Sequence, residues 1–293
     1  MKQSRSEFIT VRGLRYHVRH WGNEDAPKLF MVHGWMDVSA SFQFMVDCLQ
    51  KDWHVIAPDW RGFGLTDDSG ADTYWFLDYV GDLDAILDHY SADEKVDLLG
   101  HSMGGNVVTI YAGVRPERIR KLINFEGFGM PVTRGEQAPG RYAQWLDELR
   151  VPPSLKTYPS QAAVAARLQK TNPRLSNVRA NFLSGHWAAP NADGQWAILG
   201  DAAHKLSSPI LYRVEEVMAC WHAITAPVLW VEAEDTDVWR WMGPKATARI
   251  EIDRRIAFIP RVTTHMIADA GHMLHHDQPE ALATLVEYFL GTE

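Results

Sequence analysis

The chain has 293 residues, of which 46% are hydrophobic and 23% are charged, and its formal net charge is -8. This length suits one large domain, or a domain that carries a sizeable insertion. Because no basic block is present to neutralise phosphates, we expect neither a nucleic-acid partner nor binding to an anionic membrane.

The cysteine content and the N-terminus favour a reducing compartment. Cys48 and Cys220 lie in apolar stretches, and a pair this sparse indicates no disulfide framework. The first residues, MKQSRSEFITV, lack the apolar core of a signal peptide, and no apolar run approaches about 18 residues. We therefore expect a cytoplasmic protein without a transmembrane helix, either a monomer or a homodimer.

Predicted strands and helices alternate through the first part of the chain. Two strands flank a turn at Arg12-Gly13, and a helix follows with a capping serine at Ser39 or Ser41. Further strands are predicted over residues 28–33, 53–59, 95–102 and 119–127, and further helices over 73–90 and 103–116. This alternation implies right-handed crossovers and a parallel sheet covered by helices on both faces.

The alternation stops between residues 130 and 222, where helical stretches are separated by segments rich in Pro, Gly and Asn. We expect no clear strand there. Alternation resumes with strands near 226–234 and 261–268, and a final helix is predicted over 279–290. The simplest organisation is a core domain of residues 1–129 and 223–293, interrupted by a helical cap of residues 130–222.

A candidate nucleophile lies where a strand should turn into a helix. Residues 100–104, GHSMG, match G-x-S-x-G, in which the serine occupies a strained turn and flanking side chains would collide. Ser102 would attack, and the amide of Met103 would face the developing oxyanion. The HGW segment at 33–35 is placed to supply a second amide, from Trp35. A glycine-rich turn with a capping serine would leave that segment unexplained.

These motifs carry a family resemblance. The segments HGW, DWRGFGLT, GHSMGG and AGHMLHHDQPE resemble the α/β-hydrolase fold from Met31 to the end of the chain. The segment HGWMDVSASF resembles the serine hydrolase-like (kraken) branch of that family. The resemblance implies a mostly parallel eight-stranded sheet with helices on both faces and an inserted helical cap. It says less about substrate, because this fold hosts many chemistries.

The resemblance also places a catalytic base in the loop after the last strand. His272 follows a glycine and precedes the final helix, as the family pattern requires. His275 and His276 lie close by, but no zinc-motif spacing accompanies the three histidines, so we expect no metal and no cofactor. His101 is expected to pack or form hydrogen bonds, and His33 to brace the oxyanion loop.

Two positions compete for the acid of a Ser-His-acid triad. On the usual family pattern, the segment APVLWVEAEDTDVW puts Thr236 in the acid's place, and only a slip would bring in Asp235 or Asp237. Haloalkane dehalogenases with a glutamate acid use the end of the preceding strand, and RIRKLINFE leads into Glu126 in the same way. We favour Glu126, which also explains a carboxylate after an apolar strand. A glutamate that reaches solvent or pairs with an arginine is the alternative.

A serine nucleophile suits attack on an acyl carbon, whereas the dehalogenases use an aspartate. We expect a hydrolase of small-molecule carboxylic esters, with Trp187, Tyr212 and Trp221 of the cap lining its pocket. Carbon–carbon bond hydrolysis, lactonase or amidase activity, and cofactor-free haloperoxidase activity are the alternatives within the enzyme class. A non-catalytic ligand receptor on the same fold is the alternative outside it.

Overall fold

The computed structural model describes residues 1–92 and 94–292. Over these residues, eight strands form one sheet in the order β1-β2-β4-β3-β5-β6-β10-β11. Strands β1 and β2 run antiparallel to their neighbours, and the others are parallel, which confirms the predicted sheet. The strands are β1 (Ser4–Val11), β2 (Leu14–Trp21), β3 (Lys28–Val32), β4 (His54–Pro58), β5 (Val96–His101), β6 (Ile119–Phe125), β10 (Val228–Ala233) and β11 (Val262–Ile267).

The first hairpin turns where the sequence predicted. Arg12 and Gly13 have φ angles of 47° and 86°, so both central residues are left-handed. Two such residues give the turn whose twist matches the flanking strands. The register then pairs Val11 with Leu14 and continues to Ser4 opposite Trp21.

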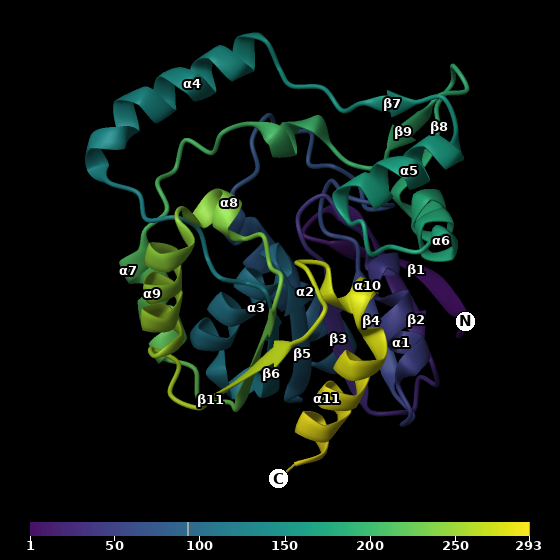
Figure 1. The fold of residues 1–293 in the computed structure, drawn as a ribbon, viewed down its shortest axis with the longest axis vertical. Helices are drawn as coiled ribbons and strands as arrows, with labels where there is room; N and C mark the ends of the chain where they lie inside the picture. The colour runs from purple at the N-terminus through teal and green to yellow at the C-terminus, as the bar shows by residue number, and fades with distance from the viewer. Residues whose placement is uncertain (93, 293) are drawn as a thin grey trace.

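Helices cover both faces of the sheet (Figure 1). On β5, Leu98 belongs to the buried cluster that contains Leu83, whereas its neighbour Leu99 belongs to the cluster that contains Val286. Successive strand residues point to opposite faces, so β5 contributes to two cores. The first core lies under α2 (Phe76–Ser91), α3 (Met103–Val114), α7 (Val214–His222) and α9 (Lys245–Ile256), and the second under α1 (Gln43–Cys48) and α11 (Pro279–Gly291). Each fully buried leucine or valine stabilises the fold by about 1.5–3 kcal/mol.

Short helices complete the core and connect its strands. They are the 3-10 turns η1 (Ser39–Phe42) and η2 (Pro116–Arg118), and the helices α8 (Trp239–Met242) and α10 (Leu274–Asp277). The predicted serine cap is wrong, because η1 precedes α1 and neither serine caps it. Instead, the Ser39 amide donates to Asp59 Oδ1 at 2.7 Å, and the Ser41 hydroxyl donates to Asp37.

The segment between β6 and β10 contains helices, as expected, but it also contains a small sheet, so the expectation of no strand is wrong. Before α7, its elements are η3 (Gly135–Gln137), α4 (Ala138–Arg150), β7 (Thr157–Tyr158), α5 (Gln161–Thr171), α6 (Asn177–Trp187), β8 (Ala188–Pro190), β9 (Trp196–Ile198) and η4 (Ala202–Lys205). The strand order is β7-β9-β8. The turn between β8 and β9 explains the difference: Asn191 Oδ1 accepts from the amides of Asp193 and Gln195, and Gly194 is left-handed. These local hydrogen bonds bring β8 and β9 together, and both strands are too short to show an alternation of apolar and polar residues in the sequence.

Several contacts hold this segment to the sheet domain. Helices α5 and α6 pack against α1 through Phe44, which shares one apolar cluster with Ala180 and Leu183 and lies edge to face on Phe182. By contrast, α4 lies away from the sheet, at the top of Figure 1, and none of its residues is buried. The C-terminal helix of the segment, α7, packs on α3 so closely that a Cβ at Gly113 would meet Cys220 O at 1.8 Å.

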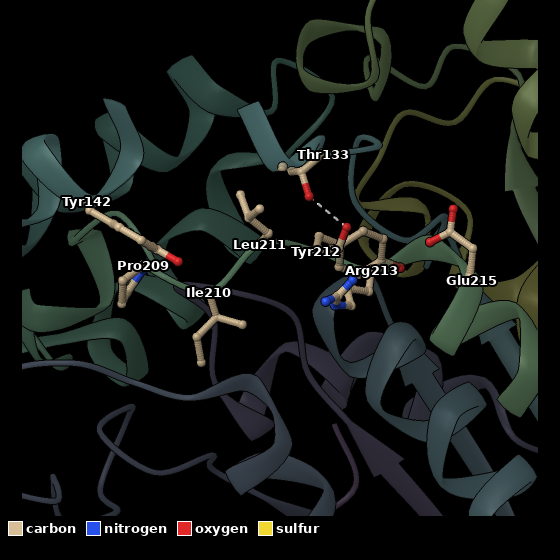
Figure 2. A pocket seen from close by; sticks show the side chains of 9 residues that line it. Thr133, Tyr142, Pro209, Ile210, Leu211, Tyr212, Arg213 and Glu215 are labelled. Atoms are coloured by element: carbon tan, nitrogen blue, oxygen red, sulfur yellow. Dashed lines mark hydrogen bonds between the residues drawn. The ribbon is translucent and has the colours of Figure 1, made fainter. Parts of the chain in front are cut away.

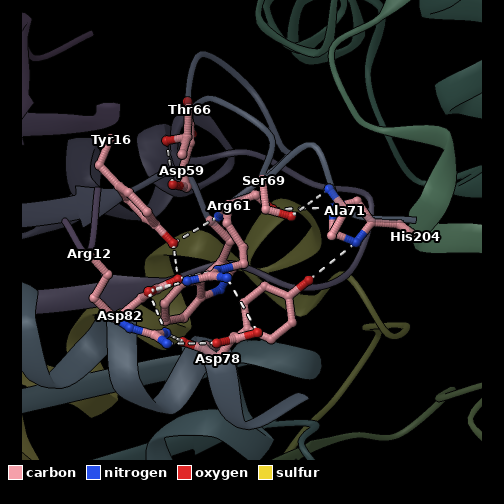
Figure 3. Close-up of polar contacts among 12 residues, drawn as sticks. Arg12, Tyr16, Asp59, Arg61, Thr66, Ser69, Ala71, Asp78, Asp82 and His204 are labelled. Carbon is pink, nitrogen blue, oxygen red and sulfur yellow. Dashed lines mark hydrogen bonds and ion pairs between the residues drawn. The ribbon is translucent and has the colours of Figure 1, made fainter. Parts of the chain in front are cut away.

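His204 makes a further contact with the sheet domain (Figure 3). Its ring stacks between Phe63 and Tyr74, with centroid distances of 3.8 and 3.7 Å. Nε2 lies 3.2 Å from Arg61 O, and Nδ1 lies 3.2 Å from Tyr79 Oη. The ring therefore binds η4 to the loop after β4.

Arg61, which carries that carbonyl, is itself fixed by charge. Its guanidinium contacts both carboxylate oxygens of Asp82 at 2.5 Å, and the Tyr16 hydroxyl accepts its amide at 3.0 Å. Asp78 adds an ion pair at 3.4 Å. Figure 3 shows these groups to the left of His204. Because Asp82 is fully buried, this network rigidifies the base on which η4 rests.

Candidate active site

The candidate residues gather where parallel strands end. Trp35 follows β3, Ser102 follows β5, Glu126 follows β6 and His272 follows β11. The carboxyl ends of parallel strands meet at one edge of a sheet, which is where open α/β sheets bind ligands.

The turn that holds Ser102 is strained. Its φ and ψ angles are 52° and -114°, a conformation that non-glycine residues rarely adopt. A Cβ at Gly100 would lie 2.4 Å from Gly104 O, and a Cβ at Gly104 would lie 2.4 Å from Val32 O. Only glycine fits at these two positions, because the neighbouring backbone comes too close for a side chain, as the motif predicted. The turn places Ser102 at the start of α3.

Hydrogen bonds join Ser102, His272 and Glu126 in one chain. His272 Nε2 lies 2.9 Å from Ser102 Oγ, and His272 Nδ1 lies 3.1 Å from Glu126 Oε2. With Nδ1 donating to the carboxylate, Nε2 is left to accept the serine proton. The structure thus brings together the predicted nucleophile, the predicted base and the favoured acid.

Glu126 is buried and held by several donors. Its backbone is also left-handed, with a φ of 57°. The amide of Ala233 donates to Oε1 at 2.7 Å, and the Thr236 hydroxyl donates to Oε2. Burial raises the pKa of Glu126, and the hydrogen bonds from His272, Thr236 and Ala233 oppose that rise. Thr236, the residue at the usual acid position, therefore contacts Glu126.

The side chains of Asp235 and Asp237, the alternative acids, form ion pairs with arginines instead of a hydrogen bond with His272. Their side chains are 55% and 39% exposed and form ion pairs with Arg174 at 2.6 Å and Arg240 at 3.0 Å. Among residues 1–92 and 94–292, the ring of His272 has hydrogen-bond partners only in Ser102 and Glu126. Neither aspartate is brought to the histidine.

Asn124 fixes the turn after the acid, a contact that sequence reasoning missed. Its Nδ2 donates to Thr109 Oγ1 at 2.8 Å, and its Oδ1 accepts from the Gly127 amide at 2.8 Å. A Cβ at Gly127 would meet Asn124 Oδ1 at 2.7 Å. A polar residue two positions before the glutamate in an apolar strand was the available signal.

The loop after β3 is braced from two sides. His33 accepts the Trp60 amide at Nε2, 2.9 Å away, and Nδ1 donates to Gly34 O at 2.7 Å, so His33 braces the loop as expected. From α6, Trp187 Nε1 donates to the carbonyl of Met36 at 2.6 Å, where φ is 55°.

The two candidate oxyanion amides flank the nucleophile. In the described part of the chain, neither the Trp35 amide nor the Met103 amide donates to a protein acceptor. Met103 is the first residue of α3, so its amide is one of the unpaired donors at a helix start. Gly34 lets the loop approach closely, since a Cβ there would lie 3.1 Å from Ser102 Cβ.

A model of the α/β hydrolase fold family matches residues 27–279. The chain belongs to the α/β hydrolase fold family. It is 25% identical over 305 residues to a serine hydrolase-like protein of Danio rerio, which covers 99% of this chain and 90% of that protein. This match confirms the resemblance to the serine hydrolase-like branch.

Other similarities are shorter or more distant. A cis-3-alkyl-4-alkyloxetan-2-one decarboxylase of Shewanella oneidensis is 33% identical over 144 residues, which cover 47% of this chain and 43% of that enzyme. The thioesterase domain from the curacin biosynthetic pathway has a TM-score of 0.85 at 22% identity, over 97% of this chain and 99% of that domain. The last similarity concerns the fold alone. No helix of the described chain is both long enough and apolar enough to span a membrane.

The three aromatic residues expected in the pocket of this hydrolase-fold protein have different surroundings. Trp187 contacts the loop after β3 through its hydrogen bond to Met36 O. Trp221 is 1% exposed and packs edge to face on Trp230 at 5.3 Å, so it belongs to the core and not to a pocket. Its place on the sheet side of α7 explains the difference, because the helix repeat alone did not show which face meets α3.

Tyr212 lines a cavity of about 420 Å³ (Figure 2). The Thr133 hydroxyl donates to its carbonyl at 2.8 Å. The other lining residues are Gly135, Tyr142, Pro209, Ile210, Leu211, Arg213 and Glu215, and neither Ser102 nor His272 is among them.

Trp241 is a further aromatic neighbour of the candidate triad. Its ring lies edge to face on His272, with centroids 5.4 Å apart, and is 43% exposed. It follows the acidic segment after β10, in α8, and no sequence pattern pointed to it. The base is therefore shielded on one side by an aromatic ring that also reaches solvent.

Proposed function

We propose that this protein is a serine hydrolase that cleaves small-molecule carboxylic esters through an acyl-enzyme intermediate. The observation that carries the proposal is the continuous hydrogen-bonded chain from Ser102 Oγ through His272 to Glu126. A serine joined to an oriented imidazole is the arrangement that activates a hydroxyl for attack on an acyl carbon.

In the proposed reaction, His272 Nε2 takes the Ser102 proton as Oγ bonds to the ester carbonyl carbon. Collapse of the tetrahedral intermediate breaks the bond to the alkoxy oxygen, and His272 delivers the proton to the leaving alcohol. Water then attacks the acyl-serine, again giving its proton to His272. The carboxylic acid leaves, and Ser102 recovers its proton.

Glu126 serves as the positioning acid in this proposal. Its bond to Nδ1 fixes the tautomer in which Nε2 can accept, and its charge stabilises the imidazolium formed during attack. The donors Thr236 and Ala233 favour the ionised carboxylate against the cost of burial.

The amides of Trp35 and Met103 form the proposed oxyanion hole. Both are free of protein acceptors within the described residues and flank the nucleophile. Removal of one such donor costs about 3–4 kcal/mol in a comparable hydrolase. We assign the choice of acyl and alcohol groups to residues 130–222, which act as a cap over the strand ends.

Steady-state and burst kinetics with p-nitrophenyl esters from acetate to decanoate test the proposal. Wild type should release p-nitrophenol repeatedly, with a burst of one equivalent where deacylation is slow, and Ser102→Ala should abolish both phases. Ser154→Ala, in the cap, is the matched control and should retain full turnover.

Three other kinetic results would contradict the proposal or favour another function. Repeated hydrolysis by Ser102→Ala would refute the nucleophile. A single turnover by wild type would favour a ligand receptor. No turnover on any ester, with lactones, amides and diketones then tried as substrates, would move the assignment to those bonds.

A further inference from the structure

Three polar side chains converge beneath the candidate active site and play no part in the proposed reaction. Asp37 lies in the loop between β3 and η1, His101 ends β5, and His275 lies in α10. Their exposed fractions are 8%, 1% and 0%. One ligand atom from each lies within 4.8 Å of the other two.

The converging atoms lack protein partners. Over residues 1–92 and 94–292, Asp37 Oδ2, His101 Nδ1 and both ring nitrogens of His275 form no hydrogen bond. A buried polar atom without a partner costs about 1–3 kcal/mol. Four such atoms on three neighbouring side chains are unusual, because most buried polar side-chain atoms are paired.

In His101 and Asp37, the polar atom that faces away from the cluster is held by a hydrogen bond. His101 Nε2 lies 2.8 Å from the carbonyl of His272, which can only accept, so Nε2 carries the proton and Nδ1 presents a lone pair to the cluster. Asp37 Oδ1 accepts from the Ser41 hydroxyl. Outer hydrogen bonds of this kind orient histidine and carboxylate ligands in metal sites.

The surroundings of His101 Nδ1 and the proton position on its ring are both compatible with a metal ligand. A Cβ at Gly34 would lie 3.2 Å from His101 Nδ1, so the glycine leaves the ring nitrogen uncovered. The bond from His101 Nε2 to the carbonyl of His272 leaves Nδ1 as the unprotonated nitrogen of that ring. Neutral imidazole is the form that binds a metal.

We propose that Asp37, His101 and His275 form a binding site for a divalent transition-metal ion of the zinc type. Two imidazoles and one carboxylate are a common ligand set for such ions. Bonds of about 2.0–2.2 Å bring tetrahedral ligand atoms to about 3.3–3.6 Å, so binding draws the three side chains closer together. His276, which faces Phe44 at 5.7 Å, is not part of the site.

This proposal departs from the expectation of no metal. That expectation considered His272, His275 and His276 as a group along the chain, whereas the fold places His275 beside Asp37 and His101. Because His101 binds the carbonyl of His272 and Asp37 shares its loop with Trp35, an ion here is coupled to both ends of the candidate catalytic site.

Binding can be measured without any activity. The untagged protein is freed of metal with a chelator and titrated with Co²⁺, recorded by visible absorption, and with Zn²⁺, recorded by calorimetry. We expect one ion per chain and a visible Co²⁺ spectrum. Asp37→Asn and His275→Gln should weaken binding by at least about 10–100-fold and change the spectrum.

Two controls separate this site from the proposed reaction and from surface histidines. Ser102→Ala should bind Co²⁺ as wild type does, since the nucleophile is not a ligand, and this result stands whether or not the protein hydrolyses esters. His265→Gln, at an exposed histidine of β11, should also leave binding unchanged. Absence of binding by wild type, or equal binding by Asp37→Asn and His275→Gln once circular dichroism shows them folded, would overturn the proposal.

Discussion

At the scale of single residues, the candidate site depends on two left-handed positions in neighbouring turns. Ser102 follows β5 with a φ of 52°, and Glu126 follows β6 with a φ of 57°. Such conformations cost about 1–3 kcal/mol each and persist where surrounding bonds fix them. Here the Ser102 amide donates to Phe125 O at 2.7 Å, and the Glu126 amide donates to Val231 O at 3.0 Å. The sheet itself therefore holds nucleophile and acid in place.

Gly34→Ala tests how finely the loop and the nucleophile are matched. The new Cβ would lie 3.1 Å from Ser102 Cβ and 3.2 Å from His101 Nδ1, so the strained serine must shift by a few tenths of an ångström. We expect kcat for ester hydrolysis to fall by about 10–100-fold with little change in KM, since small misplacements of reacting groups are costly.

Gly140→Ala is the matched control, because a Cβ there meets nothing within 4 Å. Its kcat should equal that of wild type. Unchanged kcat in Gly34→Ala would show that the loop yields without disturbing Ser102.

At the scale of elements, the candidate oxyanion loop depends on a helix far away in sequence. The indole of Trp187, at the end of α6, donates to Met36 O, and Met36 is itself left-handed. A loop residue in this conformation requires support from outside the loop. The segment 130–222 therefore supports the candidate oxyanion loop directly, through the hydrogen bond from Trp187.

Trp187→Phe removes this one hydrogen bond and keeps most of the ring. We expect kcat to fall by about three- to tenfold, equivalent to a bond of about 0.5–1.5 kcal/mol, while the unfolding midpoint changes little. Trp75→Phe, at a half-exposed indole outside the site, serves as the control and should leave kcat unchanged. A larger effect of the control would assign the loss to general aromatic packing.

The sequence predicted the structure best at positions where the local backbone geometry dictates the residue type. Alternation and glycine spacing predicted the parallel sheet and the turn at Ser102, because both depend on neighbours in the chain. The acid stayed ambiguous, since the contact between Thr236 and Glu126 joins residues from two different strand ends. The β8–β9 hairpin and the burial of Trp221 were missed for similar reasons: a side-chain turn at Asn191 and the packing of α7 on α3 leave little trace in periodicity.

At the scale of the whole molecule, the segment 130–222 is fixed to the sheet domain by α7, which packs on α3, and by several contacts before that helix. The stacking of His204 between Phe63 and Tyr74 is one, and the Phe44 cluster is another. Helix α4 contributes no buried residue. Regions with few buried contacts open at lower free energy than the core, so we expect the part before α7 to open more easily than α7, and these two contacts to oppose that opening.

Docking through His204 should depend on pH. Burial lowers the pKa of His204 from its ordinary 6.5 to about 4. The folded protein therefore binds fewer protons than the unfolded chain between pH 4 and 6.5, and the stabilisation is full above pH 6.5 and is lost as pH falls towards 4. The free energy of unfolding of wild type should drop by about 2–3 kcal/mol more than that of His204→Gln between pH 7 and pH 4.

Urea denaturation of both proteins at each pH measures that difference. Other buried histidines contribute equally to wild type and variant, so the comparison isolates His204. Parallel pH profiles would show that the ring is protonated in the folded state without cost.

The central claim is that Glu126 completes a triad with His272 and Ser102, and its most direct test is the kcat/KM of Glu126→Gln. This should be compared with wild type and with the double variant Asp235→Asn/Asp237→Asn on one p-nitrophenyl ester, each protein being shown folded by its thermal midpoint. Glu126→Gln should lose about 10³–10⁴-fold, by analogy with the orienting aspartate of serine proteases, and the double variant should stay within about twofold of wild type. Near-normal turnover by Glu126→Gln, or collapse of turnover in the double variant, would contradict the account.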